Sequence, residues 1–254
     1  MSRKMLIAGN WKMNKIGSEA VQTAKKLTVL CANMKGVEVV VAPSYLSLPL
    51  VAKIFQNTII ETGAQNLYFE KEGAFTGEIS AVMIKATGAN YVLIGHSERR
   101  QSFGETNASV CKKIQAAIGS GLKPILCIGE TESQKNKEKT FVVLENQISD
   151  GLKGFDPCEL TDLVIAYEPV WAIGTGKTAS IEQVKEIHQY LRLLLEKLFS
   201  KNFADRIRIL YGGSVTPANI KELMTIENVD GALVGGASLD ADKFMQIIQS
   251  GIQL

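Results

Sequence analysis

The chain is 254 residues long, 46% of them hydrophobic and 21% charged, and its formal net charge is +2. A chain of this size and composition can bury one large hydrophobic core. Its lysines and arginines are scattered, so we expect neither a nucleic-acid-binding stripe nor a polybasic patch for a membrane surface. No apolar run approaches the roughly 18 residues that a membrane helix needs, so we expect no contact with a membrane.

Cysteine and histidine usage limits the metal chemistry. The four cysteines form no CxxC pair, and the only histidines are His96 and His188, which excludes a His-rich cluster. We therefore expect no metal and no cofactor, and we interpret His188 as a surface or packing residue. The start of the chain, Met1 to Lys4, carries no export signal, so reduced thiols and a cytoplasmic location are expected.

Short apolar runs alternate with amphipathic stretches along the chain, which is the pattern of successive strand–helix units. In chain order, the predicted strands are Met5 to Gly9, Val37 to Ala42, Ile59 to Gly63, Tyr91 to Ile94, Pro124 to Ile128, Leu163 to Tyr167, Ile207 to Tyr211 and Gly231 to Val234. The predicted helices that follow them are Ser18 to Met34, Leu46 to Phe55, Ser80 to Thr87, Thr106 to Ser120, Lys137 to Gly151, Ser180 to Phe203, Thr216 to Met224 and Ala241 to Ser250.

Eight such units predict an α/β fold, a closed (β/α)8 barrel, and the lack of a linker predicts a single domain over residues 1–254. The alternative is an open doubly wound sheet. Such a sheet usually has a GxGxxG turn after its first strand, whereas this chain has Gly9-Asn10-Trp11-Lys12 there. The barrel also predicts where a site would form, because the carboxyl ends of its strands gather at one rim.

Glu168 comes at the end of the sixth predicted strand, in the segment AYEPVWAIGTGKT (residues 166–178). The segment continues with an apolar clasp around Trp171 and then with glycines, which predicts a lid that closes over the carboxylate. The ending GKT is also found in nucleotide-binding P-loops. Such a loop needs a glycine five residues before Gly176, where this chain has Trp171, so ATP binding is rejected.

Other predicted strands also end in polar or glycine residues. These are Asn10 and Lys12 after the first strand, His96 after the fourth, Gly212-Gly213-Ser214 after the seventh and Gly235-Gly236 after the eighth. Each has an ordinary structural explanation by itself, but the barrel would bring all of them to one rim beside Glu168. The two glycine turns leave backbone N–H groups uncovered, which predicts a phosphate cradle.

The motifs of this chain resemble those of the triosephosphate isomerase family from end to end. AGNWKMN (residues 8–14), GAFTGEIS (73–80), IGHSERR (94–100), AYEPVWAIGTGKT, YGGSV and VGGASL occur in the order of that family. The resemblance implies a TIM barrel isomerase that interconverts D-glyceraldehyde 3-phosphate and dihydroxyacetone phosphate in glycolysis and gluconeogenesis. It also implies Glu168 as catalytic base, His96 as a neutral electrophile, Lys12 as substrate anchor and Asn10 as a supporting donor. The substrate-binding residues that it implies are Asn10, Lys12, Gly174, Ser214, Gly235 and Gly236.

Isomerisation needs one base and one donor, and no redox cofactor. Glu168 suits the base role if a closed lid removes water, because desolvation raises the pKa of a carboxylate. Two alternatives stay open: a barrel enzyme acting on another phosphorylated substrate, and a barrel that binds without turnover. The first should alter the clasp, and the second should have lost Glu168 or His96.

The predicted loop Gln65 to Glu78 carries four apolar residues among glycines: Leu67, Tyr68, Phe69 and Phe75. Such residues would be poorly placed in water, so we expect a partner to cover them. The alternative is that the loop packs only on its own chain. The family resemblance implies a homodimer in which this loop, with Thr76 near its tip, reaches the neighbouring subunit's site around Lys12 and Met13.

Overall fold

Eight parallel strands form a closed barrel in this computed structural model, which describes residues 3–173 and 178–252. The strands are β1 Met5–Asn10, β2 Val37–Ala42, β3 Ile60–Ala64, β4 Tyr91–Ile94, β5 Lys123–Ile128, β6 Val164–Tyr167, β7 Arg208–Tyr211 and β8 Gly231–Val234. Each agrees with its predicted range to within one residue, and the predicted (β/α)8 barrel is confirmed. The open-sheet alternative is wrong, because β1 pairs with β8 in a register that joins Leu6 to Gly231.

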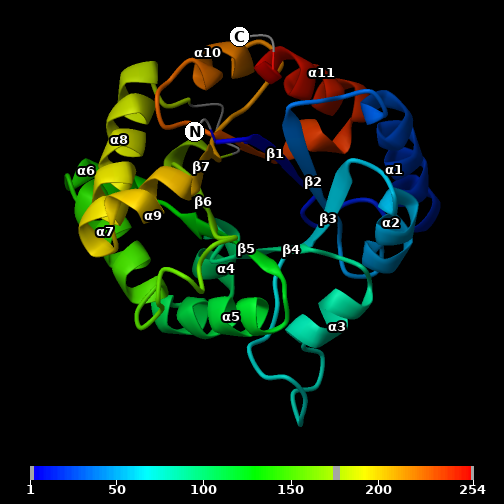
Figure 1. The fold of residues 1–254 in the computed structure, drawn as a ribbon, viewed down its shortest axis with the longest axis horizontal. Helices are drawn as coiled ribbons and strands as arrows, with labels where there is room; N and C mark the ends of the chain where they lie inside the picture. Colours follow the sequence, from blue (N-terminus) through cyan, green and yellow to red (C-terminus); the bar gives the residue numbers. More distant parts are fainter. Residues whose placement is uncertain (1–2, 174–177, 253–254) are drawn as a thin grey trace.

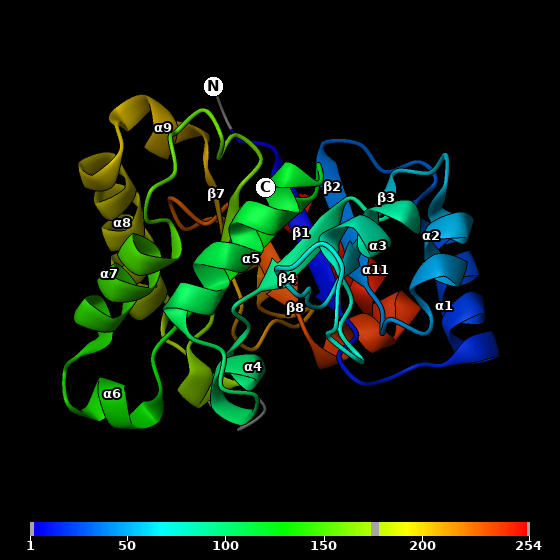
Figure 2. The ribbon, with the colours of Figure 1, turned by 90° about the horizontal axis from the view of Figure 1, so that it is seen from below.

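Helices surround the barrel (Figure 1). They are α1 Gly17–Cys31, α2 Leu48–Phe55, α3 Ala81–Ala86, α4 Ser97–Ser102, α5 Asn107–Gly119, α6 Glu132–Asn136, α7 Thr140–Gly151, α8 Ile181–Leu198, α9 Lys201–Arg206, α10 Ile220–Met224 and α11 Ala241–Ile252, with 3-10 turns η1 Val170–Ala172 and η2 Gly236–Leu239. Figure 2 shows α4 and α6 at the end of the barrel where the strands finish, and α9 at the opposite end. No helix in the described ranges is long and apolar enough to cross a membrane.

The strands bury both of their faces. Successive side chains of a strand point to opposite faces, so Leu6 and Ala8 in β1 join a cluster inside the barrel while Ile7 packs in the larger core shared with the helices. The inner cluster is Leu6, Ala8, Val40, Ala42, Tyr91, Leu93, Ile125, Cys127, Val164, Ala166, Leu210 and Leu233. Filled in this way, the barrel is a rigid support for the loops at its rim.

Two predicted helices are wrong as continuous elements. The stretch Ser180 to Phe203 is divided into α8 and α9, because Ser200 has an extended backbone and its hydroxyl caps a new helix by accepting a hydrogen bond from the Phe203 amide. The stretch Lys137 to Gly151 yields only α7, and α6 precedes it. Glu138, between α6 and α7, has a positive φ of 54°, which no helix accommodates.

Candidate active site

The carboxyl ends of the strands enclose a cavity of about 330 Å³. It is lined by Asn10, Lys12, His96, Glu168, Ile173, Gly212, Gly213, Ser214, Val215, Thr216, Leu233, Gly235, Gly236 and Ala237. The predicted site residues Asn10, Lys12, His96, Glu168, Ser214, Gly235 and Gly236 are all in this set. Gly174, with the rest of the predicted lid tip, lies outside the described residues.

Glu168 is only 2% exposed and holds its carboxylate between two donors. Oε2 accepts a hydrogen bond from the Ser97 amide at 3.0 Å, and Oε1 lies 2.9 Å from Nε2 of His96. Burial raises the pKa of Glu168, but His96 and the Ser97 amide lower it, and the net direction is downward. The pKa of Glu168 is therefore lowered in this structure, whereas the sequence predicts a raised pKa once a closed lid removes water.

His96 is the N-cap residue of α4. Its Nδ1 accepts a hydrogen bond from the Glu98 amide at 3.3 Å, which leaves Nε2 to carry the proton that faces Glu168. Burial lowers the pKa of His96, whereas the carboxylates of Glu168 and Glu98 raise it, and the net direction is upward. This direction opposes the neutral ring that the family resemblance implies. We attribute the difference to the direct contact with Glu168, which a bound substrate would interrupt.

Lys12 follows β1 and is fixed at three points. Its amide donates to Oδ1 of Asn10 at 3.0 Å, its carbonyl accepts from Nε2 of Gln65 at 2.9 Å, and its Nζ lies 2.5 Å from Oε1 of Glu98. Its backbone has a positive φ of 52°, uncommon for a residue with a side chain. The structure thus gives Asn10 a part that sequence reasoning missed, since Asn10 holds Lys12 by accepting a hydrogen bond.

The two glycine turns form the other side of the cavity. Among the described residues, no backbone carbonyl accepts a hydrogen bond from the amide of Gly235 or Gly236. A Cβ built on Gly236 would meet nothing within 4 Å. Gly212 is different, because a Cβ there would lie 2.9 Å from Cγ of Glu168. The turn after β8 therefore leaves room and free donors for an anion, while the turn after β7 must be glycine to fit the carboxylate.

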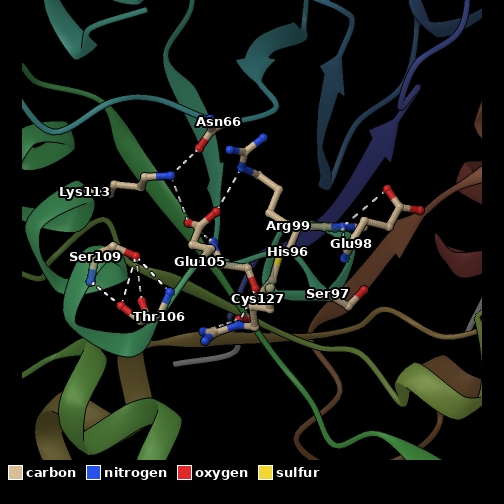
Figure 3. A network of polar contacts seen from close by, with 12 residues as sticks. Asn66, His96, Ser97, Glu98, Arg99, Glu105, Thr106, Ser109, Lys113 and Cys127 are labelled. Atoms are coloured by element: carbon tan, nitrogen blue, oxygen red, sulfur yellow. Dashed lines mark hydrogen bonds and ion pairs between the residues drawn. The ribbon is translucent and has the colours of Figure 1, made fainter. Parts of the chain in front are cut away.

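A buried ion-pair network supports the segment that carries His96 (Figure 3). Glu105 accepts hydrogen bonds from the Gly95 amide at 3.2 Å and from Nε of Arg99 at 2.9 Å. Its Oε1 also lies 3.1 Å from Nζ of Lys113, which in turn donates to Asn66. Gly95 and Arg99, on either side of His96, are thereby linked through Glu105 to Lys113 of α5.

Sequence reasoning missed three other contributors to the site. Glu98 pairs with Lys12, Gln65 holds the Lys12 carbonyl, and Glu130 is a buried carboxylate that accepts hydrogen bonds from Trp171 and Tyr167. Glu98 lies inside the IGHSERR motif, and Glu130 follows β5 at the same rim as the predicted residues. Glu130 could have been found from the sequence, because it is a polar residue that comes just after the end of a predicted strand. Cys127, near the same rim, is a wholly buried packing residue.

The loop between β3 and α3 projects from the barrel (Figure 1). The expectation that all four of its apolar residues need a partner is wrong for Leu67. Leu67 is fully buried in its own chain, and Tyr68 is half-buried and stacks on Phe69 with ring centroids 4.4 Å apart. Phe75, 4.9 Å from Tyr68, is the member of the set that stays exposed.

Among the described residues, no group of three or more histidine, cysteine, aspartate or glutamate side chains is arranged to hold a metal ion. The site thus consists of a carboxylate, an imidazole and an ammonium group around a cavity with free backbone donors. That set can move a proton and stabilise negative charge.

Comparison with known proteins assigns the family. Residues 5–251 match the triosephosphate isomerase family. Triosephosphate isomerase of Geotalea uraniireducens (strain Rf4) is 50% identical over 247 residues, which cover 97% of this chain and 98% of that protein. The enzyme of Rhodopirellula baltica (strain DSM 10527 / NCIMB 13988 / SH1) is 50% identical over 250 residues, covering 98% of each. The crystal structure of triosephosphate isomerase from Bartonella henselae matches with a TM-score of 0.89 at 36% identity, covering 98% of this chain and 100% of that one. Matches at this identity over nearly the full length set aside the two alternatives left open above, and the chain belongs to the triosephosphate isomerase family.

Proposed function

We propose that this chain carries out its family's reaction in the cavity at the barrel rim, with Glu168 as the base. Triosephosphate isomerases interconvert D-glyceraldehyde 3-phosphate and dihydroxyacetone phosphate through an enediolate, a step of glycolysis and gluconeogenesis. One observation supports these roles above all others. Oε1 of Glu168 lies 2.9 Å from Nε2 of His96, inside a cavity that Lys12 and two glycine turns also line.

The contact between Glu168 and His96 defines the first step. When a substrate oxygen accepts the hydrogen bond from Nε2–H of His96, His96 no longer donates to Glu168. The main cause that lowers the pKa of Glu168 is then lost. Burial then acts with less opposition and raises that pKa, which makes the carboxylate a stronger base. Glu168 takes a proton from one carbon and returns it to the next, while His96 and Lys12 stabilise the charge that develops on the oxygens.

We propose that the phosphate binds at Ser214, Gly235 and Gly236, and that Gly174 joins them. Support comes from the open space and free amides of the turn after β8. Lys12 lies next to this turn, since a Cβ on Gly235 would be 3.5 Å from Cε of Lys12. Its ammonium group can therefore neutralise part of the phosphate charge.

A coupled assay tests the proposal. Purified protein should convert glyceraldehyde 3-phosphate to dihydroxyacetone phosphate without added cofactor or metal. Exhaustive treatment with EDTA should leave the rate unchanged, because no described residues form a metal site. An activity that is lost on chelation and restored by a divalent metal would contradict the proposed mechanism.

We also propose a homodimer formed through the loop from Gln65 to Glu78. A second cavity of about 260 Å³ lies beside Lys12, and its lining includes Met13 and Phe103, which are 96% and 68% exposed. Apolar side chains this exposed favour a surface that another subunit covers. The Ser44 hydroxyl at the same cavity is buried and has no hydrogen-bond partner among the described residues.

We propose that residues 1–254 act as one domain, because the described strands close a single barrel. We also propose a cytoplasmic location. Its support is that Cys31, Cys111, Cys127 and Cys158 are all free, as expected in a reducing compartment.

A further inference from the structure

Trp171 lies in η1, three residues after Glu168, and is held on two sides. Its Nε1 donates to Oε1 of Glu130 at 2.6 Å. On its face, Nζ of Lys135 lies 3.1 Å from the ring centroid, a short cation–π contact. The indole is 9% exposed, so both charged groups act on it in a site with little water.

The local sequence around α6 explains why Lys135 reaches the indole. Thr131 caps the helix in a capping box with Gln134, and the Lys135 amide donates to the Thr131 carbonyl at 2.9 Å. The first turn of α6 is thereby fixed directly after Glu130. Lys135 is half-buried, whereas Lys137 and Lys139, in the same lysine-rich run, are exposed.

The backbone around Glu168 is attached to the same place. The Glu168 amide donates to the Ile128 carbonyl at 2.7 Å, and the Val170 amide donates to the Glu130 carbonyl at 3.2 Å. A Cβ on Gly129 would overlap the Glu168 carbonyl oxygen at 1.7 Å, so the end of β5 and the start of this segment touch. A shift of Trp171 against β5 would therefore be transmitted to Glu168.

We propose that Lys135 is a positioning residue for the isomerase reaction. It clamps the Trp171 ring against Glu130 and so fixes the short backbone segment that carries Glu168. Lys135 is not among the residues that line the cavity, and its ammonium group contacts the Trp171 ring. The proposal rests on Glu168 being the base.

Lys135→Met tests the clamp, because methionine keeps most of the apolar stem and removes the charge. Loss of a partly desolvated cation–π contact corresponds to a change of roughly 5- to 30-fold. We expect kcat to fall by about that factor and KM to stay within about twofold, since phosphate binding is left intact. Lys135→Arg should restore kcat, because a guanidinium also stacks on indole. Lys137→Met, the matched control, should behave as the unmodified protein.

A spectroscopic readout separates the clamp from the chemistry. The chain has two tryptophans, Trp11 and Trp171, so a ¹H–¹⁵N spectrum should show two indole N–H signals. Lys135→Met should shift the Trp171 signal and leave that of Trp11, which donates to the Ser238 carbonyl, in place. Unchanged kcat with an unmoved Trp171 signal would overturn the proposal, as would an equal loss of kcat in Lys137→Met. If Glu168 proved not to be the base, Glu168→Asp would keep its turnover, whereas the indole shift would still report on the clamp.

Discussion

Glu168 and His96 are in direct contact, with Oε1 of Glu168 2.9 Å from Nε2 of His96. Their pKa values move in opposite directions for the same reason, since the carboxylate favours the imidazolium and the imidazolium favours the carboxylate. Separating the two side chains would therefore raise the pKa of Glu168 and lower the pKa of His96.

Glu168→Asp should lower kcat by about a hundredfold or more and change KM little. Shortening the side chain moves the carboxylate by roughly one carbon–carbon bond, and a misplacement on the order of 1 Å can cost about a hundredfold in rate. The glycine turns after β7 and β8, where we propose that the phosphate binds, are not altered by the change. Steady-state kinetics in both reaction directions provide the measurement. Glu186→Asp, an exposed change on α8, is the control, and near-parental turnover in Glu168→Asp would remove Glu168 from the base role.

His188 is wholly buried in α8, and its Nδ1 lies 3.0 Å from the Asn228 carbonyl oxygen. Burial lowers its pKa to about 4 from 6.5, so the folded protein favours the neutral ring. Stability from this group is complete above pH 6.5 and is lost as the pH falls towards 4, because the unfolded chain takes up a proton first.

His188→Gln should therefore flatten the pH dependence of stability. In the unmodified protein the shift of this pKa corresponds to a loss of about 2 kcal/mol of unfolding free energy between pH 7 and pH 5. Urea unfolding of both proteins at each pH and one protein concentration measures the difference. An identical pH dependence in the two would show that His188 does not titrate as its burial requires.

At the scale of elements, the strands were predictable because each is buried on both faces and reads as a short apolar run. The breaks within helical stretches were less predictable. The pattern of Leu191 and Leu195 in α8 continues as far as Phe203 in α9, and the chain still breaks at Ser200. The Ser200 cap ends one helix and begins another there, and the spacing of the apolar residues does not predict that break.

The same limit applies to the site. Residues directly after strands, such as His96 and Glu168, could be placed at one rim from topology alone. The hydrogen bond between these two side chains could not be predicted, because it depends on side-chain rotamers. Gln65 and Glu130 act on Lys12 and Trp171 across the gap between neighbouring loops, and sequence separation carries no information about such contacts.

The contact between the ends of β5 and β6 leads to a prediction for Gly129→Ala. The added Cβ would lie 1.7 Å from the Glu168 carbonyl oxygen, so the backbone of one strand end must move. We expect a loss of about 3 kcal/mol or more of unfolding free energy, together with reduced kcat. Gly119→Ala is the matched control, because a Cβ there meets nothing within 4 Å and a helix gains up to about 1 kcal/mol from the change. Equal urea midpoints for both variants would show that the two strand ends are not in contact.

At the scale of the whole molecule, closure of the barrel joins the first and last strands and so completes the site. Lys12 comes from the β1 end and Gly235 from the β8 end, and the pairing of Gly9 with Val234 places them side by side. The site still has an exposed flank, since Met13 and Phe103 line an open cavity next to Lys12. A second subunit that covers this flank would also limit the motion of Lys12.

The exposed tip of the loop from Gln65 to Glu78 carries Phe75 and Thr76. Phe75→Glu or Thr76→Arg should place a charge in a contact that excludes water, where an unpaired charge is costly, and the dimer should dissociate. Val142→Glu, an apolar-to-charged change at an exposed position of α7, is the control and should remain dimeric.

The monomer should also lose most of its activity although its own Glu168 and His96 are intact, because Lys12 and Met13 would no longer be covered. Sedimentation and assay at matched concentrations measure both effects. A folded monomer with full activity would show that the site is complete within one chain, and a loop variant that stays dimeric would place the interface elsewhere.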